Sequence, residues 1–119
     1  MRTGLVFLLT LLPLGCAGRP GEAAERALAE TFLEGIRVGR VEEAWTGASP
    51  EFKSFMGKDQ FKSFVWSNPV LKEKAVFEKA EPLPEGKWVL CSFAGKSKKV
   101  LLTLGPEEGG WKVVGMKVE

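Results

Sequence analysis

The stretch WVLCSFAGKSKKVLLTL, residues 88–104, holds two apolar runs on either side of a short polar segment. Both runs are rich in β-branched, aromatic and other apolar residues, which is typical of strands. Gly95 and Lys96 supply turn chemistry between the runs. The stretch therefore predicts an antiparallel hairpin, and the sheet that contains this hairpin decides the fold.

The sequence on each side of the hairpin adds one more strand. The hydrophobic period changes from helical to alternating near Lys74, and strands are predicted over 74–81, 86–94, 98–104 and 111–118. Turn chemistry separates the strands at 84–86 (PEG), 94–97 (AGKS) and 105–110 (GPEEGG). Consecutive hairpins of this kind predict a four-stranded antiparallel sheet.

The residues before the sheet follow a helical period instead. A helix over 23–39 is predicted because apolar residues recur four apart, at Ala24, Leu28, Phe32 and Ile36. Three short helices are expected to follow: one over 40–45, one capped by Ser49, and one capped by Asp59. The order of elements predicts an α+β domain in which N-terminal helices pack on a curved four-stranded antiparallel sheet.

The turns also suggest a register for the sheet. A turn centred on Gly95 and Lys96 places Cys91 opposite Val100, and a pair between Leu104 and Trp111 places Leu102 opposite Val113. The inner face is then almost wholly apolar and should meet the helices. It carries Val89, Cys91, Phe93, Val100, Leu102, Leu104, Trp111 and Val113.

The outer face keeps an apolar centre where a solvated sheet face would alternate to polar residues. This association face consists of Trp88, Leu90, Leu101, Val114 and Met116, with Lys99 and Lys112 at its rim. Such a patch predicts a homodimer or a complex with an envelope protein. The alternative is that a helix or the chain's own N-terminal segment covers this face.

Residues 1–15 are typical of a secretory signal peptide. Arg2 supplies a positive charge, and an apolar run extends from Leu5 to Leu14. The run is shorter than the roughly 20 apolar residues that a membrane-spanning helix needs, and Pro13 disfavours a core helix. The sequence therefore predicts export.

Cys16 ends this leader in the order Leu14-Gly15-Cys16, which resembles the lipobox of bacterial lipoproteins. The resemblance implies that Cys16 is lipidated and anchors the mature chain to a membrane. Cleavage after Ala17 is the alternative, and it would give a soluble periplasmic or secreted protein without Cys16. The predicted organisation is a signal peptide over 1–15, a lipidated N-terminus and tether over 16–23, and a single domain over 24–119.

Three further segments resemble a known superfamily: GRVEEAW at 39–45, SPEFKSF at 49–55, and GGWKVVGMKVE at 109–119. With the N-terminal amphipathic helix, they look like the nuclear-transport-factor-2-like (cystatin-like α+β cone) superfamily. The resemblance implies a curved sheet that wraps a long helix and leaves an apolar hollow. We expect this hollow to be lined by Phe32, Phe61, Phe64, Val89, Phe93 and Trp111.

Enzymes of that superfamily use Asp, His or Tyr in the hollow, and the composition of this chain argues against their chemistry. The chain has no His and no Tyr, and its single Asp is at a predicted helix cap. Glu42 and Glu43 are the nearest candidates for an acid or base, although solvated helix positions explain them better. No catalytic residue, cofactor or metal site is predicted, because zinc and calcium sites need ligand sets that this chain lacks.

Two other features have ordinary structural interpretations. Cys91 is expected to be a buried, unpaired thiol within an apolar strand. The basic cluster GKSKK at 95–99 can contact anionic lipid headgroups or protect a hairpin tip from aggregation. The full chain has a net charge of +2, and loss of Arg2 with the leader leaves +1, so the exported chain is not expected to bind nucleic acid.

Two functions from different classes follow from these observations. The first is a non-enzymatic binding or interaction module of the cell envelope, which offers its hollow or its outer sheet face to a ligand or protein. The second is a small enzyme of the isomerase, dehydratase or hydrolase kind that relies on a glutamate. The group that faces the apolar hollow distinguishes them, because an enzyme needs a charged or donor side chain there.

Overall fold

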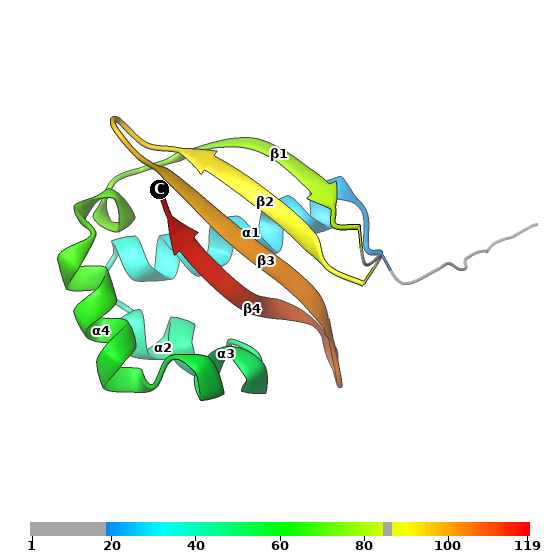
Figure 1. The fold of residues 1–119 in the computed structure, drawn as a ribbon, viewed down its shortest axis with the longest axis horizontal. Helices are drawn as coiled ribbons and strands as arrows, with labels where there is room; N and C mark the ends of the chain where they lie inside the picture. Colours follow the sequence, from blue (N-terminus) through cyan, green and yellow to red (C-terminus); the bar gives the residue numbers. More distant parts are fainter. Residues whose placement is uncertain (1–18, 85–86) are drawn as a thin grey trace, which may run out of the picture.

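The computed structural model describes residues 19–84 and 87–119. The predicted signal peptide, the predicted lipidation site Cys16 and most of the PEG turn lie outside the described residues. The described chain forms four α-helices followed by a four-stranded sheet in which all neighbours are antiparallel, in the order β1-β2-β3-β4. The predicted α+β class is confirmed (Figure 1).

The helices occupy the first half of the described chain. They are α1 (Glu22–Arg37), α2 (Val41–Thr46), α3 (Pro50–Phe55) and α4 (Lys58–Ser67), followed by a short 3₁₀ helix, Pro69–Lys72. The strands are β1 (Val76–Pro82), β2 (Val89–Ala94), β3 (Lys99–Glu107) and β4 (Gly110–Val118). Helix α1 lies against one face of the sheet, and α2, α3 and α4 gather at one end of it (Figure 1).

The starts of the short helices follow from local hydrogen bonding. Ser49 caps α3 as predicted, because its Oγ accepts a hydrogen bond from the backbone N–H of Phe52 at 3.0 Å. The predicted cap of α4 at Asp59 is wrong. The cap lies two residues earlier, at Gly57, so helix α4 begins at Lys58, and the Gln60 side chain accepts a hydrogen bond from the Gly57 N–H at 2.9 Å. Asp59 instead lies in the first turn of α4, where a negative charge is favoured.

The register of the central hairpin differs from the prediction by two residues. Cys91 lies opposite Leu102, and the last pair before the turn is Ala94 with Lys99. The loop is therefore longer than predicted, and it is closed by a hydrogen bond from the Gly95 N–H to the Lys98 carbonyl at 2.8 Å. A shift of two residues keeps every side chain on its predicted face, because side chains alternate along a strand.

A β-bulge changes the faces of β4. Leu104 pairs with Val113, and Thr103 pairs with Gly115, so Val114 is an extra residue between two pairs. Met116 therefore lies opposite Leu102 and packs against the core. Its predicted place on the outer face is wrong. The predicted pair of Leu104 with Trp111 is also wrong, because β3 and β4 extend further and Trp111 lies opposite Pro106.

Aromatic rings fill the centre of the domain between the helices and the sheet. Phe32, Phe52 and Phe61 come from three different helices, and their ring centroids lie 5.4–6.0 Å apart. Edge-to-face contacts of this kind stabilise a core beyond the area that they bury. The predicted inward residues Phe93, Val100, Leu102 and Leu104 are all buried beside them.

Candidate functional site

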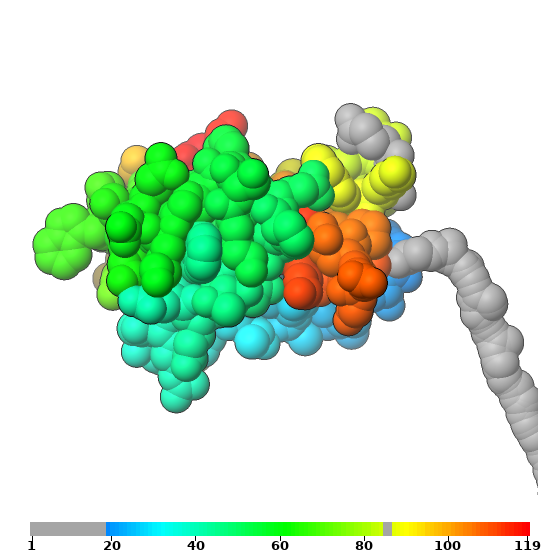
Figure 2. Space-filling model, turned by 90° about the horizontal axis from the view of Figure 1, so that it is seen from below, coloured from blue at the N-terminus to red at the C-terminus, as the bar shows by residue number. Residues whose placement is uncertain are grey.

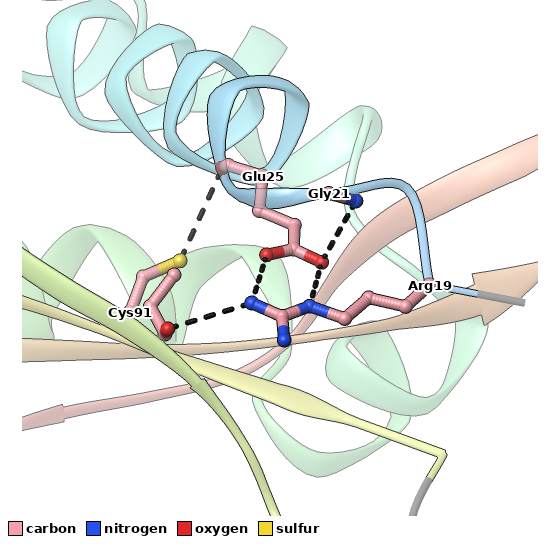
Figure 3. A network of polar contacts seen from close by, with 5 residues as sticks. Arg19, Gly21, Glu25 and Cys91 are labelled. Carbon is pink, nitrogen blue, oxygen red and sulfur yellow. Dashed lines mark hydrogen bonds and ion pairs between the residues drawn. The ribbon is translucent and has the colours of Figure 1, made fainter.

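A partly buried polar cluster joins the beginning of the described chain to α1 and the sheet (Figure 3). The Arg19 guanidinium donates to both carboxylate oxygens of Glu25, from Nε at 2.8 Å and from Nη2 at 3.0 Å. The Gly21 N–H donates to the same carboxylate at 3.3 Å, and Arg19 Nη2 reaches the Ala80 carbonyl of β1 at 3.5 Å. We call this arrangement the N-terminal clamp, meaning Arg19, Gly21, Glu25 and Ala80.

The clamp places a charged carboxylate inside the fold. The Glu25 side chain has no exposed surface, whereas 40% of the Arg19 side chain is exposed. The hydrogen bond to Glu25 raises the pKa of Arg19 above its usual value. Two parallel charge-assisted hydrogen bonds from Arg19 and one from a backbone N–H offset the free-energy cost of removing the Glu25 carboxylate from water.

Glu25 is the residue that the sequence analysis missed. The apolar stripe predicted for the first helix begins at Ala24, and it leaves Glu25 outside. In the structure the buried stripe of α1 consists of Glu25, Ala29, Phe32 and Ile36, and Ala24 is exposed. The predicted stripe that begins at Ala24 and the observed stripe that begins at Glu25 both fit a helical period. The signal that could have identified the observed stripe is Arg19, which lies six residues before Glu25 and pairs with it.

Cys91 lies directly beneath the clamp. Its thiol sits 4.0 Å from the carbonyl oxygen of Glu25 and is buried and unpaired, as predicted for this cysteine. Burial is the main cause that raises the pKa of Cys91 to about 11, and the nearby Glu25 charge adds to it. Because the thiolate is the reactive form, this thiol is not poised as a nucleophile at neutral pH.

This environment predicts that Cys91 escapes thiol reagents in the native protein. With a pKa of about 11, the thiolate is a minor species at pH 8, and the side chain is buried. We expect 5,5′-dithiobis(2-nitrobenzoate) to label Cys91 only after denaturation, in a Cys16→Ser background that leaves one thiol. Rapid labelling of the native protein would contradict this, and a Ser97→Cys variant on the exposed loop provides the positive control.

An open groove of about 750 Å³ runs along α1, between α2 and the segment 73–75. We call it the α1 groove. Its apolar lining consists of Ala27, Leu28, Phe32, Leu33, Val38, Ala44, Ala75, Phe93 and Val113. Its charged lining consists of Glu30, Glu34, Arg37, Arg40, Glu43, Glu73 and Lys74. The groove thus combines an apolar surface with a charged rim.

Much of the rim charge is already paired. Arg37 donates from Nε to Glu34 at 2.9 Å, and Arg26 donates to Glu30 at 3.0 Å. The pKa of Glu34 is lowered by its hydrogen bond from Arg37, so this carboxylate stays ionised near neutral pH. An ionised carboxylate that is paired with an arginine can border an apolar ligand, but it is poorly suited to exchange protons with that ligand.

Of the six residues predicted to line a hollow, two line the α1 groove and four do not. Phe32 and Phe93 line the α1 groove. Phe61 and Val89 are buried in the core, and Phe64 and Trp111 pack against it while partly exposed. Phe52, which was not singled out from the sequence, fills the space between Phe32 and Phe61.

Four of the residues predicted for the association face lie on the outer face of the sheet. Trp88 is 38% exposed, and Leu90, Leu101 and Val114 are half-buried. Trp88 packs on Gly105, where an added Cβ would come within 2.7 Å of the indole ring. No described helix lies over this face of the sheet in Figure 1. Four of the five predicted residues therefore share one surface, and Met116 does not.

Other candidate chemistry has simpler explanations. Glu42 accepts hydrogen bonds from Lys62 at the surface, which lowers the pKa of Glu42, and Glu43 is also exposed. Within residues 19–84 and 87–119, no cluster of three or more His, Cys, Asp or Glu side chains could hold a metal ion. In the same ranges no helix has the length and hydrophobicity to cross a membrane.

Comparison with known proteins gives no relative for this chain. No family model, no curated protein and no solved structure matches it.

Proposed function

We propose that the chain is a non-enzymatic binding module of the bacterial cell envelope that takes an apolar ligand, or an apolar segment of a partner protein, in the α1 groove. The observation that carries the proposal is the composition of the groove. Leu28, Leu33 and Ala44 leave apolar surface beside α1, and four of the seven charged rim side chains pair with one another, Arg37 with Glu34 and Arg40 with Glu43. Ligand pockets are typically apolar with a few polar groups that set orientation.

The alternative is a small isomerase, dehydratase or hydrolase that uses a glutamate. Such an enzyme needs a carboxyl group that is buried, aimed at the substrate and able to release its proton. Glu25 is the fully buried carboxylate of the described residues, but it is bound to Arg19 and does not line the α1 groove. These contacts favour binding over catalysis.

The cellular setting of the module is also part of the proposal. A lipid on Cys16 would anchor the chain to a membrane of the envelope, as the order Leu14-Gly15-Cys16 suggests. Membership in the nuclear-transport-factor-2-like superfamily is proposed as well. The order of helices followed by an antiparallel sheet is compatible with it.

The outer sheet face offers a second surface, for a homodimer or an envelope protein. Leu90, Leu101 and Val114 are half-buried on this face, and Trp88 is exposed at one end of it, where it packs on Gly105. Burial of a large apolar side chain contributes about 1.5–3 kcal/mol before the entropic cost of association is subtracted. This surface and the α1 groove lie on opposite sides of the sheet, so both can be occupied together.

A groove-filling variant tests the proposed ligand site. Thr31 is exposed and lines the α1 groove, so Thr31→Trp should fill it without removing a core side chain. We expect 8-anilinonaphthalene-1-sulfonate, an apolar fluorescent anion, to bind the native soluble domain saturably at one site. Thr31→Trp should abolish this binding, and Thr46→Trp, on an exposed position outside the groove, should preserve it. Equal binding by both variants would contradict the proposal.

A further inference from the structure

The N-terminal clamp fixes where the chain enters the domain. Arg19 is held by Glu25 and by the Ala80 carbonyl, so the entry point lies beside the end of β1 and the start of β2. Three residue steps separate Cys16 from Arg19, and three trans peptide steps span at most about 11 Å. An anchor at Cys16 therefore cannot hold the domain at a distance from the bilayer.

The clamp also determines which end of the domain is close to the anchor. The end of β1, the start of β2 and the hairpin between β3 and β4 lie at the same end of the sheet as the entry point, whereas the 95–99 loop lies at the far end of the strands (Figure 1). Seen from below, the yellow and orange segments lie at the same end of the molecule as the blue start of the described chain, and the helices α2 to α4 lie at the opposite end (Figure 2). We call the surface around the entry point the sheet end, defined by Pro82, Pro84, Lys87, Trp88 and Pro106.

We propose that the sheet end rests on the lipid bilayer, with Trp88 at the level of the headgroups, so that the helices and the α1 groove face away. This inference rests on the proposed lipid anchor at Cys16. Trp88 is 38% exposed and Lys87 is exposed beside it, and both residue types are favoured where a protein meets a membrane interface.

Charge attraction alone would select a different orientation. The sheet end carries Lys87 together with Glu107 and Glu108 on the neighbouring hairpin, so its charge is mixed. The densest basic cluster is at Lys96, Lys98 and Lys99, on the hairpin at the opposite end of the sheet. A short tether overrides this attraction, because it limits which surface can reach the lipid at all. The basic cluster is therefore directed away from the anchoring membrane.

Two matched cysteine variants test the orientation. The full chain is produced in a bacterial host with its leader, labelled with bimane at Lys87→Cys or at Lys98→Cys, and reconstituted in phosphatidylethanolamine and phosphatidylglycerol vesicles that contain brominated lipids. Both positions are exposed lysines next to hairpin strands, and native Cys91 is buried. We expect the lipid to quench most of the fluorescence at position 87 and little at position 98.

The length of the tether provides the control. A Gly-Ser insertion between Gly18 and Arg19 leaves the clamp intact and should reduce the difference between the two labels. Equal quenching without the insertion, or stronger quenching at position 98, would overturn the orientation while leaving the anchor in place. A chain that stays in the aqueous phase during detergent partition, in the same way as its Cys16→Ser variant, would overturn the anchor and the orientation together.

Discussion

Leu102→Glu is expected to unfold the domain. Leu102 is completely buried in the middle of β3, between Cys91 on one neighbouring strand and Met116 on the other. Loss of a buried leucine side chain costs about 2–5 kcal/mol, and an unpaired buried carboxylate adds several more. Because small domains are stable by about 5–15 kcal/mol, the variant should lose the cooperative transition that circular dichroism detects during urea unfolding.

Leu101→Glu is the matched control, because it places the same charge one residue away on the opposite face. Leu101 is half-buried on the outer face and lies opposite Ser92 and Lys117. We expect this variant to fold, with a loss of about 1–2 kcal/mol for partial burial of apolar surface. A folded Leu102→Glu and an unfolded Leu101→Glu would show that the two faces have been exchanged.

The same control reports on the proposed homodimer. Light scattering on a soluble domain that lacks residues 1–16 should show a dimer for the native sequence and a monomer for Leu101→Glu. A native domain that stays monomeric at high concentration would contradict association through the outer sheet face and would leave the α1 groove as the proposed binding surface.

The sequence predicts the sheet well because its signals are periodic. The alternation in residues 88–104 places Phe93, Val100 and Leu102 on the helix side, and an error of two residues in register does not change that outcome. The bulge at Val114 is different, because one extra residue reverses the face of everything that follows it. The position of the bulge depends on how β4 pairs with β3, and a valine at position 114 does not by itself predict a bulge.

The candidate site was harder to predict because it depends on contacts between distant segments. The α1 groove forms where α2 and the segment 73–75 approach α1. Hydrophobic periodicity predicts which face of an element is buried, but it does not predict a space between elements that are distant in the sequence. Glu25 was hidden because a glutamate on a helix is normally solvated. Arg19 belongs to a stretch with the composition of a flexible tether, and it is held only because Glu25 occupies an inward position of α1.

Removal of Arg19 is expected to destabilise the domain far more than removal of its partner. In Arg19→Ala the Glu25 carboxylate stays inside the fold without its cation, and a broken buried pair of this kind costs on the order of 3 kcal/mol. In Glu25→Leu the arginine is left with a partly exposed side chain that water can hydrate, and a leucine joins the buried stripe of α1. We expect that variant to be close to the native stability.

Urea unfolding of a double-mutant cycle measures this asymmetry. Arg19→Ala combined with Glu25→Leu should recover most of the stability that Arg19→Ala loses, because no unpaired charge then remains buried. Arg26→Ala is the control, since Arg26 pairs with Glu30 on the same helix and lies over the Phe77 ring at 4.9 Å, and two exposed contacts of these kinds together contribute about 1 kcal/mol. Equal effects of Arg19→Ala and Arg26→Ala would show that the clamp is an ordinary surface ion pair. The entry point of the chain, and with it the proposed approach of the sheet end to the membrane, would then be unconstrained.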